Sequence, residues 1–180
     1  MSAPFSRTVE LAAIPATGLE RSISADSAEL AALARAYDIA EVRKLAADLT
    51  LTRETGGVIR VNGRVIAEIV QTCVVSLVPV EQAIDESIDV RLVEAGSPRA
   101  EAAARPGAEV MISPDEPDPP DVLSGPILDL GVIATEHFLL AVDPYPRAPG
   151  AELPAEAADS LPDAGDSPFA ALARLRRETG

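Results

Sequence analysis

Residues 59–77 read IRVNGRVIAEIVQTCVVSL, and the odd-numbered positions along them are mostly apolar. The apolar positions of one parity are Ile59, Val61, Val65, Ala67, Ile69, Cys73, Val75 and Leu77. A period of two predicts a half-buried β-strand, with residues such as Arg60 and Arg64 on the opposite face. The parity is unchanged across Asn62-Gly63, so we expect one long strand with a bulge at this dipeptide rather than a hairpin.

Segments with the same alternation lie on both sides of this strand. Leu45, Ala47, Leu49 and Leu51 alternate with polar residues, and so do Ile84, Ile88, Val90 and Leu92. The turn Thr55-Gly56-Gly57 precedes the central strand, and Pro79 marks a turn after it. We therefore expect an antiparallel sheet of at least three strands.

Two segments have helical spacing instead. Residues 26–36 form the first predicted helix, with Asp26 as its cap and Glu29 at the third helical position. A second helix begins after Asp129 and ends before Pro144, with an apolar stripe that includes His137. The fold class is α+β, an antiparallel sheet with packed helices, and the sequence leaves a barrel-like closure of the sheet open.

The charge of −14 is unevenly distributed along the 180 residues, because residues 107–166 contribute −12 of it. We predict a single α+β domain over 1–148, with an acidic, Pro-rich loop around 107–121. Residues 149–166 are predicted to be a flexible acidic linker, and residues 167–180 a basic C-terminal helix tethered by it. Such acidity argues against a protein that binds nucleic acid over its whole surface.

Catalytic and metal-binding patterns are absent from the sequence. The chain has one histidine, His137, and one cysteine, Cys73, too few for a zinc site or a disulfide. We interpret His137 as a hydrogen-bonded helix residue and Cys73 as a buried structural thiol. No nucleotide-binding glycine motif occurs, and the apolar runs are too short to span a membrane. We expect a soluble cytoplasmic protein that is not an enzyme and that has no catalytic residue, metal or other cofactor.

The C-terminal helix is the candidate binding segment. Its candidate site residues are Phe169, Leu172, Arg174, Leu175, Arg176 and Arg177. One interpretation is a docking helix for RNA phosphates or for an acidic protein groove. The other is that the arginines only complement the C-terminal end of the helix dipole.

Three segments in series resemble the YceD family, the large ribosomal RNA subunit accumulation proteins. They are VIAEIVQTCVVSLVPV at 65–80, ILDLGVIATEHFLLAVDP at 127–144 and SPFAALARLR at 167–176. The resemblance implies a bacterial, non-enzymatic ribosome biogenesis factor that supports accumulation of large-subunit (23S) rRNA and assembly of that subunit. Its implied partner is large-subunit rRNA or a pre-ribosomal particle, reached directly or through a basic ribosomal protein, with no membrane and no DNA involved.

The chain departs from the family pattern at one position. Many members carry Cys-x-x-Cys where this chain has Cys73-Val-Val-Ser76, so a metal role does not carry over. A second function stays open beside the first: an acidic protein–protein adaptor or chaperone for a basic partner, with no direct RNA contact.

Overall fold

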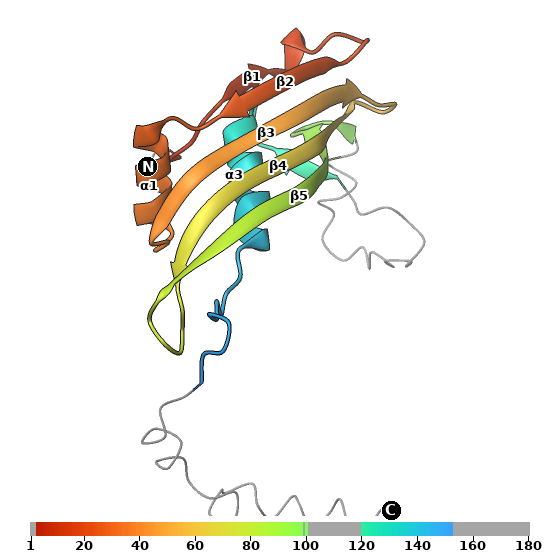
Figure 1. Cartoon of the computed structure of the whole chain (residues 1–180). Helices are drawn as coiled ribbons and strands as arrows, with labels where there is room; N and C mark the ends of the chain where they lie inside the picture. The colour runs from red at the N-terminus through yellow and green to blue at the C-terminus, as the bar shows by residue number, and fades with distance from the viewer. Residues whose placement is uncertain (1–2, 99, 101–119, 153–180) are drawn as a thin grey trace, which may run out of the picture.

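The computed structural model describes residues 3–98, 100 and 120–152, and its largest element is a five-stranded sheet (Figure 1). The strands are β2 (Leu19–Ser24), β3 (Glu41–Arg53), β4 (Val58–Thr72), β5 (Pro79–Glu94) and β6 (Asp121–Leu123). Their order in the sheet is their order in the chain. Neighbouring strands are antiparallel, except that β5 and β6 are parallel. Two further strands, β1 (Thr8–Glu10) and β7 (Ile127–Asp129), pair antiparallel with each other.

The predicted α+β class and the largely antiparallel sheet are confirmed. Helices α1 (Ser27–Ala36) and α3 (Leu130–Ala141), with a short 3-10 helix over Leu11–Ala13, accompany the strands. The barrel-like closure is not confirmed, because β2 and β6 are the two ends of the sheet and do not pair with each other. Neither of the two described α-helices is long and apolar enough to cross a lipid bilayer.

Strand β4 confirms the predicted long central strand, but the prediction of a bulge at Asn62-Gly63 is wrong. The pairing of β4 with β3 and β5 continues in register through Gly63, and the register shift of β3 lies between Val42 and Lys44. Gly63 is required for another reason: a Cβ there would lie 2.0 Å from the carbonyl oxygen of Asp48 on β3. The glycine lets the two backbones approach closely.

The predicted strand also ends earlier than expected. Strand β4 stops at Thr72, and residues 73–78 form the turn into β5 instead of continuing the strand to Leu77. In this turn the backbone N–H of Cys73 donates to the carbonyl of Val78, at 2.9 Å. Leu77 adopts a left-handed conformation with a φ of 60°, which breaks the extended backbone that the apolar parity had indicated.

Helix α1 has the predicted N-terminus. The Asp26 side chain accepts from the backbone of Ala28 and Glu29, and the Glu29 carboxylate accepts from the backbone N–H of Asp26. The guanidinium of Arg7 also binds Glu29 through both of its terminal nitrogens, at 2.7 and 2.8 Å. The capping box therefore attaches α1 to the N-terminal segment as well as starting the helix.

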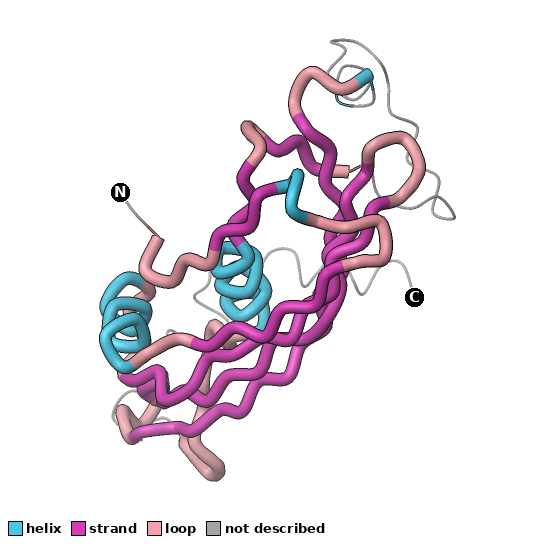
Figure 2. The backbone as a smooth tube through the Cα atoms, turned by 90° about the horizontal axis from the view of Figure 1, so that it is seen from above, coloured by secondary structure: helices cyan, strands magenta, loops and turns pink. Residues whose placement is uncertain are grey.

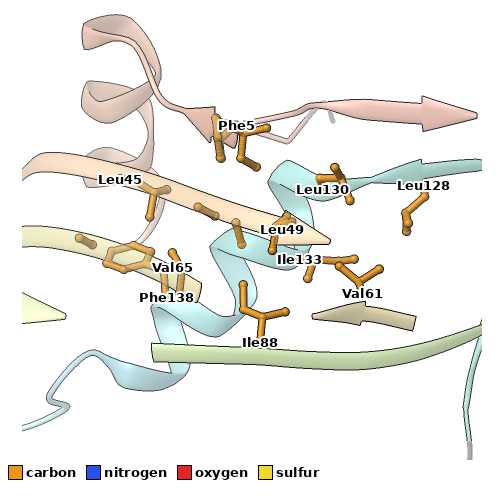
Figure 3. Close-up of a cluster of buried hydrophobic side chains, with 14 of the residues drawn as sticks. Phe5, Leu45, Leu49, Val61, Val65, Ile88, Leu128, Leu130, Ile133 and Phe138 are labelled. Carbon is orange, nitrogen blue, oxygen red and sulfur yellow. The ribbon is translucent and has the colours of Figure 1, made fainter. Parts of the chain in front are cut away.

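Helix α3 lies on the concave face of the sheet, where the core is (Figure 2). Figure 3 shows Leu130, Ile133 and Phe138 of α3 pointing toward apolar side chains of β3, β4 and β5. The N-terminal segment crosses close to the start of this helix: a Cβ on Gly131 would lie 2.6 Å from the carbonyl oxygen of Phe5. The opposite face of the sheet is open to solvent along much of β3, β4 and β5, but at one end Ala100 packs on Val58 of β4 and Val93 of β5.

Candidate functional site

The candidate binding residues predicted from the sequence lie outside the described residues. This holds for Phe169, Leu172, Arg174, Leu175, Arg176 and Arg177, and also for the predicted C-terminal helix as a whole. Most of the predicted acidic loop and most of the predicted linker also lie outside. These assignments stay predictions.

The structure confirms that His137 is a hydrogen-bonded helix residue. It is half-buried on α3, and its Nδ1 lies 3.1 Å from the carbonyl oxygen of Ile133, one helical turn earlier. The imidazole is thereby engaged with its own helix. Thr135, on the buried side of the same helix, donates its hydroxyl to the Gly131 carbonyl in the same way.

Cys73 is fully buried, as predicted, but it belongs to a turn. Its sulfur accepts hydrogen bonds from backbone N–H groups. The backbone N–H groups of Ala148 and Ser76 both point at its Sγ, each at 3.3 Å. The hydrogen bond from the Ala148 N–H, followed by those from the side chain and the backbone of Ser76, lowers the pKa of the thiol to about 6, because these donors stabilise the thiolate. Among the described residues no group of three or more His, Cys, Asp or Glu side chains could hold a metal ion.

The Cys73 turn also anchors the chain that follows α3. The backbone N–H of Val74 donates to the carbonyl of Pro146, and the Gln71 amide donates to the carbonyl of Asp143, at 2.9 and 2.8 Å. Together with the Ala148 contact, these bonds hold residues 143–148 beside the β4–β5 hairpin. The sulfur is thus part of a structural junction between two chain segments distant in sequence.

The open face of the sheet carries several charged side chains, and its basic residues in β3, β4 and β5 are paired with carboxylates. Arg60 holds both carboxylate oxygens of Asp89 at 2.7 Å, and Arg64 holds those of Asp85 at 2.9 and 2.5 Å. Arg43 instead divides its nitrogens between two carboxylates, Glu81 at 2.6 Å and Glu41 at 2.9 Å. The guanidinium of Arg60 keeps the pKa of the Asp89 carboxyl below its usual range. An RNA phosphate at this face would have to displace these carboxylates.

The described body as a whole is acidic. It contains 19 of the 29 acidic residues and 10 of the 15 basic residues of the chain, a net charge of −9. Its exterior therefore favours a basic partner over the phosphate backbone of a nucleic acid. Sequence patterns alone did not reveal the Arg–carboxylate pairs, because each joins residues on different strands whose register is set by the fold.

Comparison with known proteins adds one match. A family model described as large ribosomal RNA subunit accumulation protein YceD matches residues 61–176, which include most of β4 and all of β5 and α3. No curated protein and no solved structure shows a significant similarity to the chain.

Proposed function

The chain belongs to the YceD family, and we propose that it is a non-enzymatic factor in assembly of the large ribosomal subunit, on which accumulation of 23S rRNA depends. The match over residues 61–176 is the observation that carries the proposal, because it covers most of β4, all of β5 and α3, and the C-terminal segment as far as Arg176. A factor of this kind acts in the cytoplasm, on rRNA or on a pre-ribosomal particle.

The absence of catalysis is part of the proposal, and the two residues best suited to chemistry support it. The His137 ring is bonded within its own helix, and the Cys73 sulfur is buried beneath the hairpin turn. The buried Cys73 sulfur is accessible to a substrate only after a local rearrangement. We therefore propose that the protein acts by binding.

Binding is proposed to use surfaces of opposite charge. The acidic body suits a basic ribosomal protein, whereas Arg174, Arg176 and Arg177 suit rRNA phosphates. Contact between three arginines and RNA predicts that affinity falls with salt on a log–log slope of roughly −2 to −3.

The experiment is a depletion with rescue. Cells depleted of the protein are expected to contain fewer mature large subunits and less 23S rRNA, measured by sedimentation and by RNA quantification. Rescue uses the wild-type chain, a variant with Arg174, Arg176 and Arg177 changed to Ala, and a matched control with Arg21, Arg35 and Arg147 changed to Ala. The control removes the same charge from exposed positions of the body.

Each rescue outcome has a defined meaning. Failure of the C-terminal variant alone would locate the essential contact in the basic segment, and equal rescue by all three chains would move it to the acidic body. A normal ribosome profile in fully depleted cells would refute the assembly function.

The net charge of the body favours a second candidate, an adaptor or chaperone that shields a basic protein and makes no RNA contact. Affinity purification before and after nuclease treatment separates the two. An association that persists without RNA supports the adaptor, whereas an association lost on RNA digestion supports direct or particle-mediated rRNA contact.

A further inference from the structure

Strand β5 leaves most of one edge unpaired within the described structure. It has 16 residues and pairs with β4 from Pro79 to Val93, but on its other side β6 pairs only with Leu92–Glu94. Figure 1 shows β5 as the outermost long strand, with α3 behind it. The preceding residues of β5 form an open edge, hereafter the β5 edge, defined by Glu81, Ala83, Asp85, Ser87 and Asp89.

The register identifies which backbone groups this edge presents. Cys73 donates its N–H to the carbonyl of Val78, and the β4–β5 pairing continues this register without a shift. In an antiparallel pair, alternate residues bond the neighbouring strand and those between them point away. The even-numbered residues of β5 therefore bond β4, and the odd-numbered ones point outward. Ala95, an odd-numbered residue, also points outward, because its N–H donates to the carbonyl of Leu123 on β6.

The same parity places acidic side chains along the edge. Glu81, Asp85 and Asp89 are exposed on the open face, and Glu86 is exposed on the opposite face. No basic residue lies in β5 between Pro79 and Val90. The arginines that bind Asp85 and Asp89 come from β4, on the side away from the edge, and each bidentate pair leaves carboxylate lone pairs free. At Asp85 and Asp89 the charge thus changes from basic on β4 to acidic on β5, and a further strand would continue this order there if it were basic.

A groove lies beneath part of this edge, between β5 and α3. It measures about 610 Å³ and lies at the Asp89 end of the edge, next to β6. Apolar Val90, Leu92, Ile133 and Leu140 line it, together with His137 and the charged residues Arg60, Asp89, Arg91, Asp121 and Glu136. Leu140 is 78% exposed although it belongs to the helix that covers the core. Near Asp89, a side chain of an added strand would face this groove, and an apolar one would cover Leu140.

From these observations we propose that the β5 edge binds an extended, Lys/Arg-rich protein segment by strand addition. The partner strand pairs with the outward backbone groups of β5. Its basic side chains lie opposite Asp85 and Asp89, and an apolar side chain at its end near Asp89 enters the groove against Leu140 of α3. This mode of recognition combines main-chain hydrogen bonds for affinity with side-chain pockets for specificity. The proposal rests on the proposed function only in taking the segment to belong to a basic ribosomal protein.

The test uses the full-length chain and a synthetic peptide of about ten residues that alternates lysine and valine. Residue-resolved hydrogen exchange is measured with and without the peptide. In the free protein, we expect fast exchange for the amides of Glu81, Ala83, Asp85, Ser87 and Asp89, and slow exchange for the even-numbered amides between them. The peptide should slow exchange of the odd-numbered amides alone, which gives an alternating pattern that nonspecific charge attraction would not produce.

Peptide variants test strand addition without altering the protein. A peptide of the same sequence with N-methyl groups on alternate backbone nitrogens keeps its charge but loses the donors for pairing. Its affinity should fall roughly tenfold or more, since each lost hydrogen bond is worth about a factor of ten. Equal affinity of both peptides would overturn the proposal in favour of simple electrostatic attraction.

Two protein variants test the edge itself. Ser87→Pro removes one outward N–H without touching the β4 ladder, and Ser87→Ala is its control. The exchange variant, Arg64→Asp with Asp85→Arg, keeps the ion pair and the net charge but reverses the sign on β5. Ser87→Pro and the exchange variant should both weaken peptide binding roughly tenfold, and Ser87→Ala should not.

If the β5 edge is occupied by another part of the chain or by a second copy, the hydrogen exchange differs. Slow exchange of the odd-numbered amides in the free monomer would show that the chain's own residues already cover the edge, and protection that grows with protein concentration would indicate a second copy. Either result would overturn the proposal. Peptide binding without any ribosome defect on depletion would refute the assembly function alone, whereas a defect without binding would refute only the β5 edge.

Discussion

Asp129 joins the start of α3 to the N-terminal segment, and replacing it by Ala should cost a measurable part of the stability. Its Oδ1 accepts from the backbone of Gly131 at 2.9 Å, of Val132 at 3.3 Å and of Arg7 at 2.8 Å. Its Oδ2 accepts from the Ser6 hydroxyl at 2.5 Å. One carboxylate therefore caps a helix and also fixes a chain segment more than a hundred residues away in sequence.

The magnitude follows from the bonds that are lost. Removal of an N-cap side chain costs about 1 kcal/mol. The Arg7 amide and the Ser6 hydroxyl then lose a partly buried, charged acceptor, which costs about 1 kcal/mol each. The expected total for Asp129→Ala is about 3 kcal/mol, or a fall in melting temperature of roughly 6 to 12 °C. Asp129→Asn retains one acceptor oxygen and should cost about 1 kcal/mol.

Urea unfolding followed by circular dichroism measures these differences, with the slope m compared between variants to check that unfolding stays two-state. The control is Glu136→Ala, which removes an exposed carboxylate from the same helix and should change stability by less than about 0.5 kcal/mol. If Asp129→Ala lay within about 1 kcal/mol of this control, the assigned double role of the carboxylate would be refuted.

Gly63→Ala should destabilise the protein by about 2 kcal/mol or more, because the new Cβ would overlap the Asp48 carbonyl on β3. Thermal unfolding measures this, and Gly125→Ala, which meets no atom within 4 Å, should stay close to wild type. The Cys73 thiol should titrate near its pKa of about 6, which the thiolate ultraviolet absorbance reports as a difference from Cys73→Ala. Because this pKa lies below the unfolded value of about 8.5, the thiolate stabilises the fold fully above pH ~8.5, and this contribution is lost as the pH falls through about 6. A titration midpoint near the unfolded value would contradict the donor geometry at Sγ.

Local signals in the sequence predicted the elements whose ends are set by nearby residues. Asp26 and Glu29 form the capping box expected from their spacing, and Asp129 and Pro144 bracket α3 as predicted. The period of two located β3, β4 and β5 because each has one buried face. In these cases the information lies within a few residues of the feature that it determines.

The features that sequence reasoning missed depend on residues distant in the chain. Gly63 looked like a bulge, because nothing near it in sequence reveals that the Asp48 carbonyl lies opposite. The short strands β1, β6 and β7 also escaped, since three residues are too few to show a period. The parallel pairing of β6 with β5 could not be predicted, because the order of strands in a sheet depends on the topology of the whole domain.

The acidic side chains of β5 have a simpler explanation, which is protection of an exposed edge against aggregation. That explanation and the proposed binding are compatible, because the same charges discriminate between two kinds of incoming strand. A second copy of β5 would place Asp85 and Asp89 opposite like charges, which is unfavourable, whereas a basic strand would find opposite charges at those positions. An edge that only needed protection could carry lysine equally well. In a protein whose body has a net charge of −9, acidic protection leaves the edge selective for basic segments, the chemistry expected of ribosomal proteins.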